Sequence, residues 1–220
     1  MNVFSQVYVV LLLITLISYI IFLEKKEWYK KMVIALMILW FITTAVAIYL
    51  VRFAGFKNNL FVFHISTPLE YTILAMLYRN VVSSTTVKKI ILISIPVFIV
   101  LSFLFGFLVQ TPDTNNTQVI IIESVIMVFL SLFFLREVLL LQQVTVLHQY
   151  PMFWISVGIL FYFIGNLVIE GMLNYLISHS MDLAKRSYRL GYIFKYLLFL
   201  LFIIGAYCNR NRGVLVLRKR

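Results

Sequence analysis

Charged residues are scarce in this sequence. They make up 12% of its 220 residues, whereas hydrophobic residues make up 63%. The mean hydropathy is +1.01, and a soluble core of this size could not hide so much apolar surface. We therefore expect lipid to be the main solvent of the chain.

Cysteine and acidic residues are also rare. The one cysteine, Cys208, cannot form an intrachain disulfide, so redox chemistry is not indicated. Only 8 acidic residues oppose 19 basic ones, a balance that nucleic-acid-binding proteins also show. Here the basic residues lie in short stretches at the ends of apolar runs, as topology signals do. This placement favours a lipid bilayer over nucleic acid as the partner.

The motifs of soluble enzymes are missing. The sequence has no phosphate-binding loop, dinucleotide glycine pattern, nucleophile elbow or pair of histidines at helical spacing. We therefore predict no catalytic residues, no metal site and no cofactor, and an enzyme is the less favoured class.

What the sequence has instead is a series of seven long apolar runs, at residues 5–23, 32–51, 59–78, 90–110, 117–136, 151–172 and 188–208. About 20 helical residues cross a hydrocarbon layer of roughly 30 Å, so these spans nearly fill the chain. The sequence predicts an all-α membrane protein, with a seven-transmembrane-helix bundle over 1–208 and a basic cytoplasmic tail over 209–220. The first run lacks the basic start and cleavage site of a signal peptide, so we expect it to be retained.

Basic residues indicate the orientation of this bundle. Most of the Lys and Arg residues lie in alternate connections, at 24–31, 79–89 and 136–150, and in the tail. The positive-inside rule places these segments in the cytoplasm and the N-terminus outside. We expect a multi-pass protein of a cell membrane, here a bacterial inner membrane. Residues 136–150 are predicted to extend the fifth helix into the cytoplasm up to Pro151, with a surface-lying segment as the alternative.

Ionisable residues inside the apolar runs are the candidates for function, because a charged group at mid-membrane is costly. These residues are His64, Glu70, Glu123, Glu170 and Lys195. The direction of each helix places most of them in the outer half of the bundle, with Glu70 nearest the middle. The sequence therefore predicts a polar pocket that opens outward and narrows towards Glu70.

Helical spacing adds neighbours to this pocket. In the sixth run, Tyr162, Asn166 and Glu170 recur every four residues and form one stripe, and Tyr192 shares a face with Lys195 in the seventh. Gly158 and Gly165 are expected to let the sixth helix approach a neighbour closely. The predicted pocket for a ligand or a proton comprises His64, Glu70, Tyr71, Glu123, Tyr162, Asn166, Glu170, Tyr192 and Lys195.

Three carboxyl groups in this pocket face one ammonium and one imidazole. They cannot all be ionised at low cost in a low dielectric, so we predict that at least one glutamate, Glu70 first, is protonated at neutral pH. The alternative is that these polar groups only hold helices together, at about 1 kcal/mol or less each.

Two stretches of the sequence resemble small seven-helix membrane proteins of Bacteroidota. They are Asn58-Asn59-Leu60 through His64-Ile65-Ser66-Thr67-Pro68-Leu69-Glu70-Tyr71, and Phe153-Trp154 through Gly158, Tyr162 and Gly165-Asn166. The resemblance implies the seven-span layout and a sensory role beside signalling proteins, and it brings no biochemical activity with it.

Two other seven-span layouts fit less well. A carboxylate in the third helix and a lysine in the seventh also occur in retinal-binding rhodopsins, but Lys195 lies near the start of its predicted span and the aromatic pattern differs. Visible absorbance of the purified protein tests that idea. Sugar transporters of the SWEET type carry Pro-Gln signatures that this sequence lacks.

The favoured function is an integral membrane sensor or receptor-like protein. It binds a small ligand or a proton in an outward-facing pocket and signals to a cytoplasmic partner protein. One alternative is a small transporter or ion pathway in which Glu70 and His64 relay protons or hold substrate. The other is a non-catalytic subunit of a membrane assembly.

Overall fold

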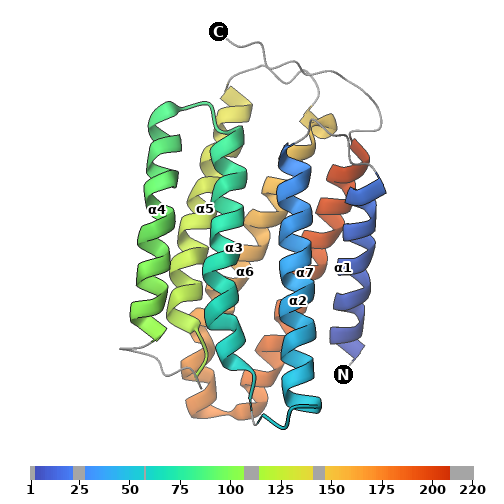
Figure 1. The fold of residues 1–220 in the computed structure, drawn as a ribbon, viewed down its shortest axis with the longest axis vertical. Helices are drawn as coiled ribbons and strands as arrows, with labels where there is room; N and C mark the ends of the chain where they lie inside the picture. Colours follow the sequence, from blue (N-terminus) through green and yellow to red (C-terminus); the bar gives the residue numbers. More distant parts are fainter. Residues whose placement is uncertain (1–2, 22–27, 57, 107–113, 141–146, 209–220) are drawn as a thin grey trace.

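The computed structural model describes residues 3–21, 28–56, 58–106, 114–140 and 147–208. Within these ranges the chain is helical apart from short connections, and its helices run up and down beside one another (Figure 1). Seven of the described helices are long and apolar enough to cross a membrane. The predicted all-α seven-helix fold is therefore confirmed.

The long helices follow one another with short connections. They are α1 (Val3–Ile21), α2 (Trp28–Arg52), α3 (Leu60–Val81), α4 (Thr85–Leu104), α5 (Thr117–Leu140), α6 (Pro151–His179) and α7 (Met181–Cys208), with a short 3-10 turn, η2 (Leu147–Gln149), before α6.

Helices suit these residues because lipid offers no partner for backbone N–H and C=O groups, which a helix satisfies internally. Local signals set several helix ends. The Ser84 side chain accepts a hydrogen bond from the Val87 N–H at the start of α4. Pro151 occupies the first turn of α6, where its missing N–H costs nothing. Gly55 has φ +73° in the turn after α2, a conformation that glycine adopts without strain.

The outer surface of the bundle is apolar. Large hydrophobic side chains are exposed on every long helix, for example Ile93 of α4 at 63% and Phe129 of α5 at 68%. A soluble monomer does not expose so much contiguous apolar surface. Together with the lengths of the helices, this makes the chain a multi-pass integral membrane protein with the lipid bilayer as its surroundings.

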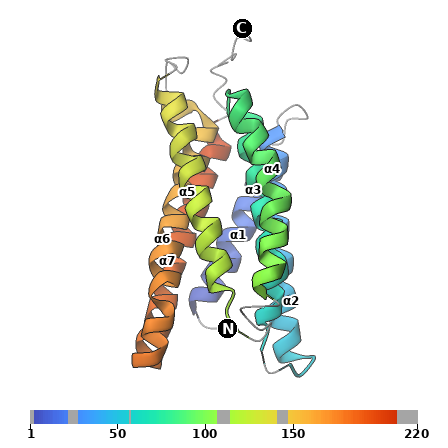
Figure 2. The ribbon, with the colours of Figure 1, turned by 90° about the vertical axis from the view of Figure 1, so that its left-hand side faces the viewer.

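The helices form a closed ring with one helix outside it. Along the ring, α1 contacts α2, α2 contacts α3, α3 contacts α5, α5 contacts α6, α6 contacts α7, and α7 returns to α1. Helix α4 packs mainly against the outer side of α3, and Figures 1 and 2 show it at the edge of the bundle. The interior of the molecule is therefore the space inside this ring.

Helices α6 and α7 approach each other closely at two glycines of α6. A Cβ atom built on Gly158 would lie 3.2 Å from Leu198 Cδ1, and one built on Gly165 would overlap the Phe194 ring. The expectation that these glycines permit close helix contact is confirmed.

The same two helices are longer than their predicted spans of 151–172 and 188–208. Both helices continue through most of residues 173–187, for which the sequence predicts a polar connection. At about 1.5 Å per residue, a helix of 29 residues is about 43 Å long and exceeds the hydrocarbon layer. Hydropathy marks only the part of a helix that lies in lipid, which explains the difference.

The segment before α6 also differs from the expectation. The described part of α5 reaches Leu140, and residues 147–149 form a 3-10 turn, so an unbroken α-helix up to Pro151 is not observed. Residues 141–146 and the basic tail at 209–220 lie outside the described residues, and so does Lys57.

One half of the ring is filled by a packed core. This closed half surrounds Tyr19, Tyr78, Phe134 and Phe202, all of which are buried. The Tyr19 hydroxyl donates to the Phe202 carbonyl at 3.1 Å. The hydroxyls of Tyr78 and Ser131 are hydrogen-bonded at 2.7 Å. Both tyrosine hydroxyls therefore have hydrogen-bond partners inside a dense interior.

Candidate ligand-binding cavity

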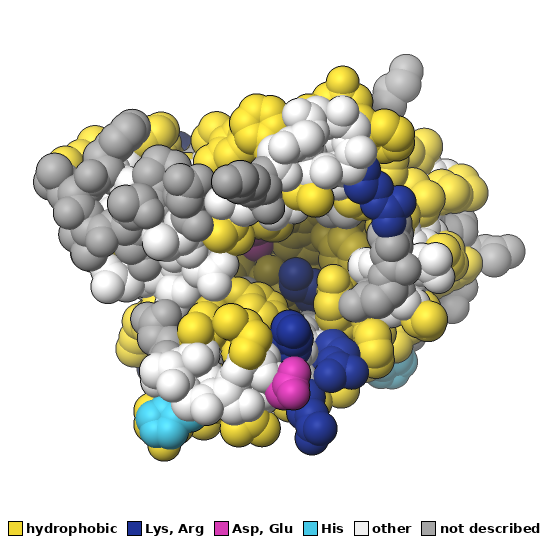
Figure 3. All heavy atoms as spheres, turned by 90° about the horizontal axis from the view of Figure 1, so that it is seen from below, with side chains coloured by type: hydrophobic (Ala, Val, Ile, Leu, Met, Phe, Trp, Pro, Cys, Tyr) yellow, Lys and Arg dark blue, Asp and Glu magenta, His cyan; other side chains and the backbone are white. Residues whose placement is uncertain are grey.

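The other half of the ring contains a cavity of about 780 Å³. It lies at the end where α1, α3, α5 and α7 begin, which we call the mouth end. Figure 3 shows it as a hollow in that face of the molecule. All helices of the ring contribute to its lining, whereas α4 does not. The volume falls within the range of small-molecule sites, about 300–1,000 Å³.

The floor of the cavity lies near the middle of the bundle. The deepest lining residues on their helices are Trp40 of α2, Glu70 of α3, Glu123 of α5, Tyr162 of α6 and Lys195 of α7. The Trp40 indole lies in hydrogen-bonding range of the Glu70 carboxyl group, and the Trp40 and Tyr162 ring centroids are 5.9 Å apart. Beyond this floor the packed core of the closed half begins.

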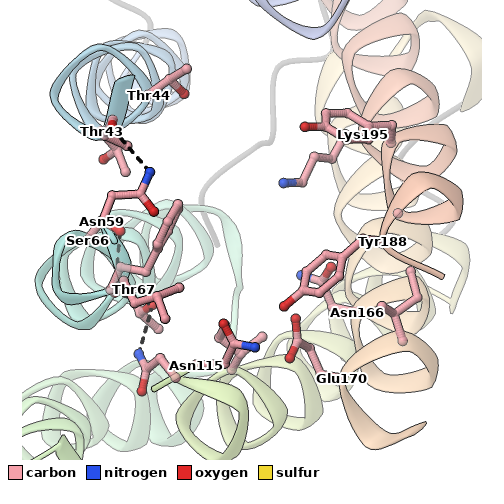
Figure 4. A pocket seen from close by; sticks show the side chains of 18 of the residues that line it. Thr43, Thr44, Asn59, Ser66, Thr67, Asn115, Asn166, Glu170, Tyr188 and Lys195 are labelled. Atoms are coloured by element: carbon pink, nitrogen blue, oxygen red, sulfur yellow. Dashed lines mark hydrogen bonds between the residues drawn. The ribbon is translucent and has the colours of Figure 1, made fainter. Parts of the chain in front are cut away.

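The two sides of the cavity differ in chemistry. Figure 4 shows hydroxyl and amide side chains from α2, α3 and the segment between them on one side, among them Thr43, Asn59 and Ser66. On the opposite side, α6 and α7 present Asn166, Glu170, Tyr188 and Lys195. Apart from Glu70 at the floor, the α2–α3 wall is therefore neutral, and the opposite wall carries several ionisable groups.

Lys195 projects from the ionisable wall into the cavity (Figure 4). Its Nζ lies 5.5 Å from the centre of the Tyr8 ring and 5.8 Å from that of Tyr192, so two aromatic faces flank the amine. Glu70 and Glu170 are close enough to attract it electrostatically, but Lys195 forms no hydrogen bond or ion pair with any described residue.

Lys195 also lies near the middle of α7 (Met181–Cys208), not near the start of its helix as the predicted span suggested. The reason is the extra helix before residue 188. The position of Lys195 along its helix therefore does not separate it from a retinal-binding lysine. Visible absorbance of the purified protein remains the test for bound retinal.

The carboxyl groups have different environments. Glu170 Oε2 accepts a hydrogen bond from the Thr117 hydroxyl at 3.0 Å. Glu123 is 2% exposed, and its Oε1 has no hydrogen-bond partner among the described residues. Glu70 and Glu123 lie close enough to interact electrostatically. Two carboxyl groups thus lie close together at the floor, and one oxygen atom of Glu123 lacks a hydrogen bond from any described residue.

A second unsatisfied acceptor lies at the start of α5. Asn116 is 3% exposed, and its Nδ2 donates to Thr67 Oγ1 at 3.2 Å. Its Oδ1 has no partner in the described part of the chain. Buried polar atoms without partners are rare in proteins, and each needs an explanation.

The structure places most of the predicted pocket residues around this one cavity. Those that line it are Glu70, Glu123, Tyr162, Asn166, Glu170, Tyr192 and Lys195. The geometry brings these side chains together from four helices, α3, α5, α6 and α7, and leaves the role of each as a prediction.

Two predicted pocket residues lie elsewhere. His64 Nε2 is hydrogen-bonded to the Thr114 carbonyl at 3.1 Å, and its Nδ1 lies beside Gly106, just after α4. The Tyr71 hydroxyl donates to Ser94 Oγ at 2.7 Å, and its ring stacks on Phe98 at 4.1 Å. Neither residue lines the cavity, because both lie on the side of α3 that faces the α4 region.

Helices α1 and α2 also contribute to the lining, which the sequence does not predict. Tyr8, Trp40 and Thr44 line the cavity, although no Lys, Arg, Asp, Glu or His lies in the middle of either helix. Asn115 and Asn116, in the connection before α5, also line the cavity. Hydroxyl and aromatic residues are common in membrane helices, so nothing in the pattern set these apart.

The rim of the cavity is basic. Lys185 is one of the lining residues, and Figure 3 shows Lys and Arg side chains gathered at one side of the hollow. This charge would attract acidic groups to the entrance. Within the described residues, no three His, Cys, Asp or Glu side chains lie together in a way that could hold a metal ion.

Comparisons with known proteins give this chain no relatives. No protein-family model matches it, and neither a curated protein nor a solved structure does. The structure supports the seven-helix layout that the resemblance implies, and no family is identified.

Proposed function

We propose that the chain is a receptor-like membrane protein that binds a small ligand in the cavity and transmits a helix movement to a partner at the opposite end. The observation that carries this proposal is the one-ended cavity. Its lining runs from the mouth end to the floor at Trp40, Glu70 and Glu123 and stops there. A receptor needs such a pocket on one side and a responsive packed region on the other.

The floor is well placed to transmit a movement. Trp40 contacts both Tyr162 and Phe199, with ring centroids 5.9 Å away in each case. Phe199 belongs to the buried core of the closed half. A ligand that displaced the Trp40 ring would therefore also displace side chains of that core. Densely packed interiors transmit such displacements because they have little free volume.

A transporter or ion pathway is less well supported. It needs a polar route to both sides, but the interior beyond the floor is occupied by apolar side chains such as Met127, Ile155 and Phe202. The His64–Glu70 relay also lacks geometric support, since His64 points away from the cavity. We therefore place transport second.

Reconstitution into proteoliposomes separates the two functions. We expect no proton flux above that of empty liposomes, in the wild type and in Glu70→Gln alike, because the closed half blocks passage. Proton flux is measured with an internal pH dye under an imposed gradient. Flux in the wild type that disappears in Glu70→Gln would overturn the receptor proposal in favour of transport.

A further inference from the structure

The α5 side of the cavity offers acceptors that no protein group satisfies. Glu123 Oε1 and Asn116 Oδ1 are both buried without a hydrogen-bond donor in the described chain. Asn116 immediately precedes α5 and Glu123 lies seven positions later, about two helical turns on, so both residues border the cavity from the α5 side. A ligand against this face has to supply N–H or O–H donors.

The α7 side of the cavity offers hydrogen-bond donors instead of acceptors. The Lys195 amine carries donors and no acceptor. It makes no hydrogen bond or ion pair with a described residue. Glu170, the carboxylate of the same wall, is already engaged by Thr117. A ligand at this side has to supply an acceptor, and an acidic group fits best.

Apolar and aromatic side chains line the rest of the cavity, beside the polar groups of α6. Ile120 of α5, Tyr162 and Ile169 of α6 and Phe63 of α3 all line the cavity. They suit a hydrocarbon or aromatic body, as in most small-molecule sites, where a few polar groups fix the orientation.

We propose that the ligand is an amphoteric small molecule, with an amine that donates to Glu123 and Asn116 and an acidic group that accepts from Lys195. This inference rests on the proposed ligand-binding function. A simple cation would leave Lys195 unpaired in the cavity, and a simple anion would leave Glu123 unpaired. A molecule with both ends satisfies both and adds no net charge to the membrane interior.

The test uses a series of ω-amino acids of increasing chain length. For each length, the alkylamine and the alkanoate serve as monofunctional controls. Binding to the full-length protein in detergent is measured by the quenching of tryptophan fluorescence, because Trp40 lies at the floor of the cavity. We expect at least one ω-amino acid to bind about tenfold or more tightly than its matched amine and its matched alkanoate, as expected for a charge-assisted hydrogen bond.

Two variants assign the ends of the ligand. In Lys195→Met the advantage of the ω-amino acid over the amine should disappear, while its advantage over the alkanoate persists. In Glu123→Gln the advantage over the alkanoate should shrink about tenfold, while that over the amine persists. Lys89→Met, on the exposed start of α4, is the matched control and should bind as the wild type does.

The outcomes distinguish this inference from the function on which it rests. If an amine or an alkanoate binds as tightly as every ω-amino acid, or if no ω-amino acid binds, the amphoteric ligand class is wrong. Binding of a monofunctional compound would still leave a ligand-binding cavity in place. The proteoliposome experiment tests the receptor proposal independently of the ligand class.

Discussion

Glu70 and Glu123 show how single ionisable residues mark a candidate functional site in a hydrophobic bundle. Both carboxyl groups lie at the cavity floor, near the middle of the bundle, and Glu123 is almost fully buried. An isolated carboxylate in such a place is expensive, so a carboxyl group there is either paired or protonated. The protonation of Glu70 predicted from the sequence is compatible with this position and stays a prediction.

Substitution of Glu70 tests its protonation. Because a carboxamide resembles a neutral carboxylic acid in size and hydrogen bonding, Glu70→Gln should change the free energy of unfolding by less than about 1 kcal/mol. Glu70→Leu leaves the Trp40 indole without its neighbour and should cost roughly 1–3 kcal/mol.

Thermal unfolding of both variants in detergent, with expression and assembly as further readouts, measures these effects. If Glu70→Gln fails to express or assemble while Glu70→Leu behaves as the wild type, Glu70 is not a neutral hydrogen-bonding group.

Single residues also mark the limit of prediction from the sequence. Glu123, Glu170 and Lys195 were identifiable because ionisable side chains stand out in apolar runs. Thr43 and Trp40 were not, because their types occur throughout membrane helices and only the fold shows which of them face the cavity.

Helix α3 illustrates the same limit at the scale of an element. Its polar residues lie on two different sides of the helix, and only one of these sides faces the inside of the ring. One carries Glu70 and Ser66 and lines the cavity, and the other carries His64 and Tyr71 and faces the α4 region. Helical periodicity gives the angle between residues, not the neighbour that each side meets.

The contact between α6 and α7 provides a prediction for these elements. A methyl group at Gly165 would overlap the Phe194 ring, so Gly165→Ala should destabilise the protein by about 1–3 kcal/mol through overpacking. Nothing lies within 4 Å of a Cβ atom at Gly171 on the same helix, so Gly171→Ala is the matched control and should be no less stable than the wild type.

This prediction is tested by comparing the midpoints of thermal unfolding of the two alanine variants, and the midpoint of Gly165→Ala should be the lower one. Equal midpoints would mean that α6 and α7 do not pack at Gly165 as described.

Over the whole molecule, the arrangement of helices explains why the cavity has one opening. The ring of α1, α2, α3, α5, α6 and α7 encloses it, and the core around Tyr78, Phe134 and Phe202 closes the other end. Span number and composition predicted the bundle. They could not predict that α4 lies outside the ring, because its apolar sequence suits lipid and helix contacts equally.

The orientation of the molecule is a prediction from charge. Most basic residues lie towards the end opposite the mouth, and the positive-inside rule places that end in the cytoplasm. The mouth should therefore face outward. That places the cavity where an external ligand could reach it, which the proposed function requires.

Access to the cavity from one side is the central claim, and thiol labelling measures it most directly. In a Cys208→Ser background, a cysteine is placed at Thr44, which lines the cavity, or at Ser156, which is buried beyond the floor. Exposed Ser178, near the end of α6, gives a reference for the mouth end. A membrane-impermeant thiol reagent is then added to intact cells and, separately, to inside-out vesicles.

We predict that the cysteines at positions 44 and 178 react in intact cells and not in inside-out vesicles, and that the cysteine at 156 reacts in neither. Reaction at position 156, or reaction at position 44 from both sides, would contradict a cavity that is open at one end and closed at the other.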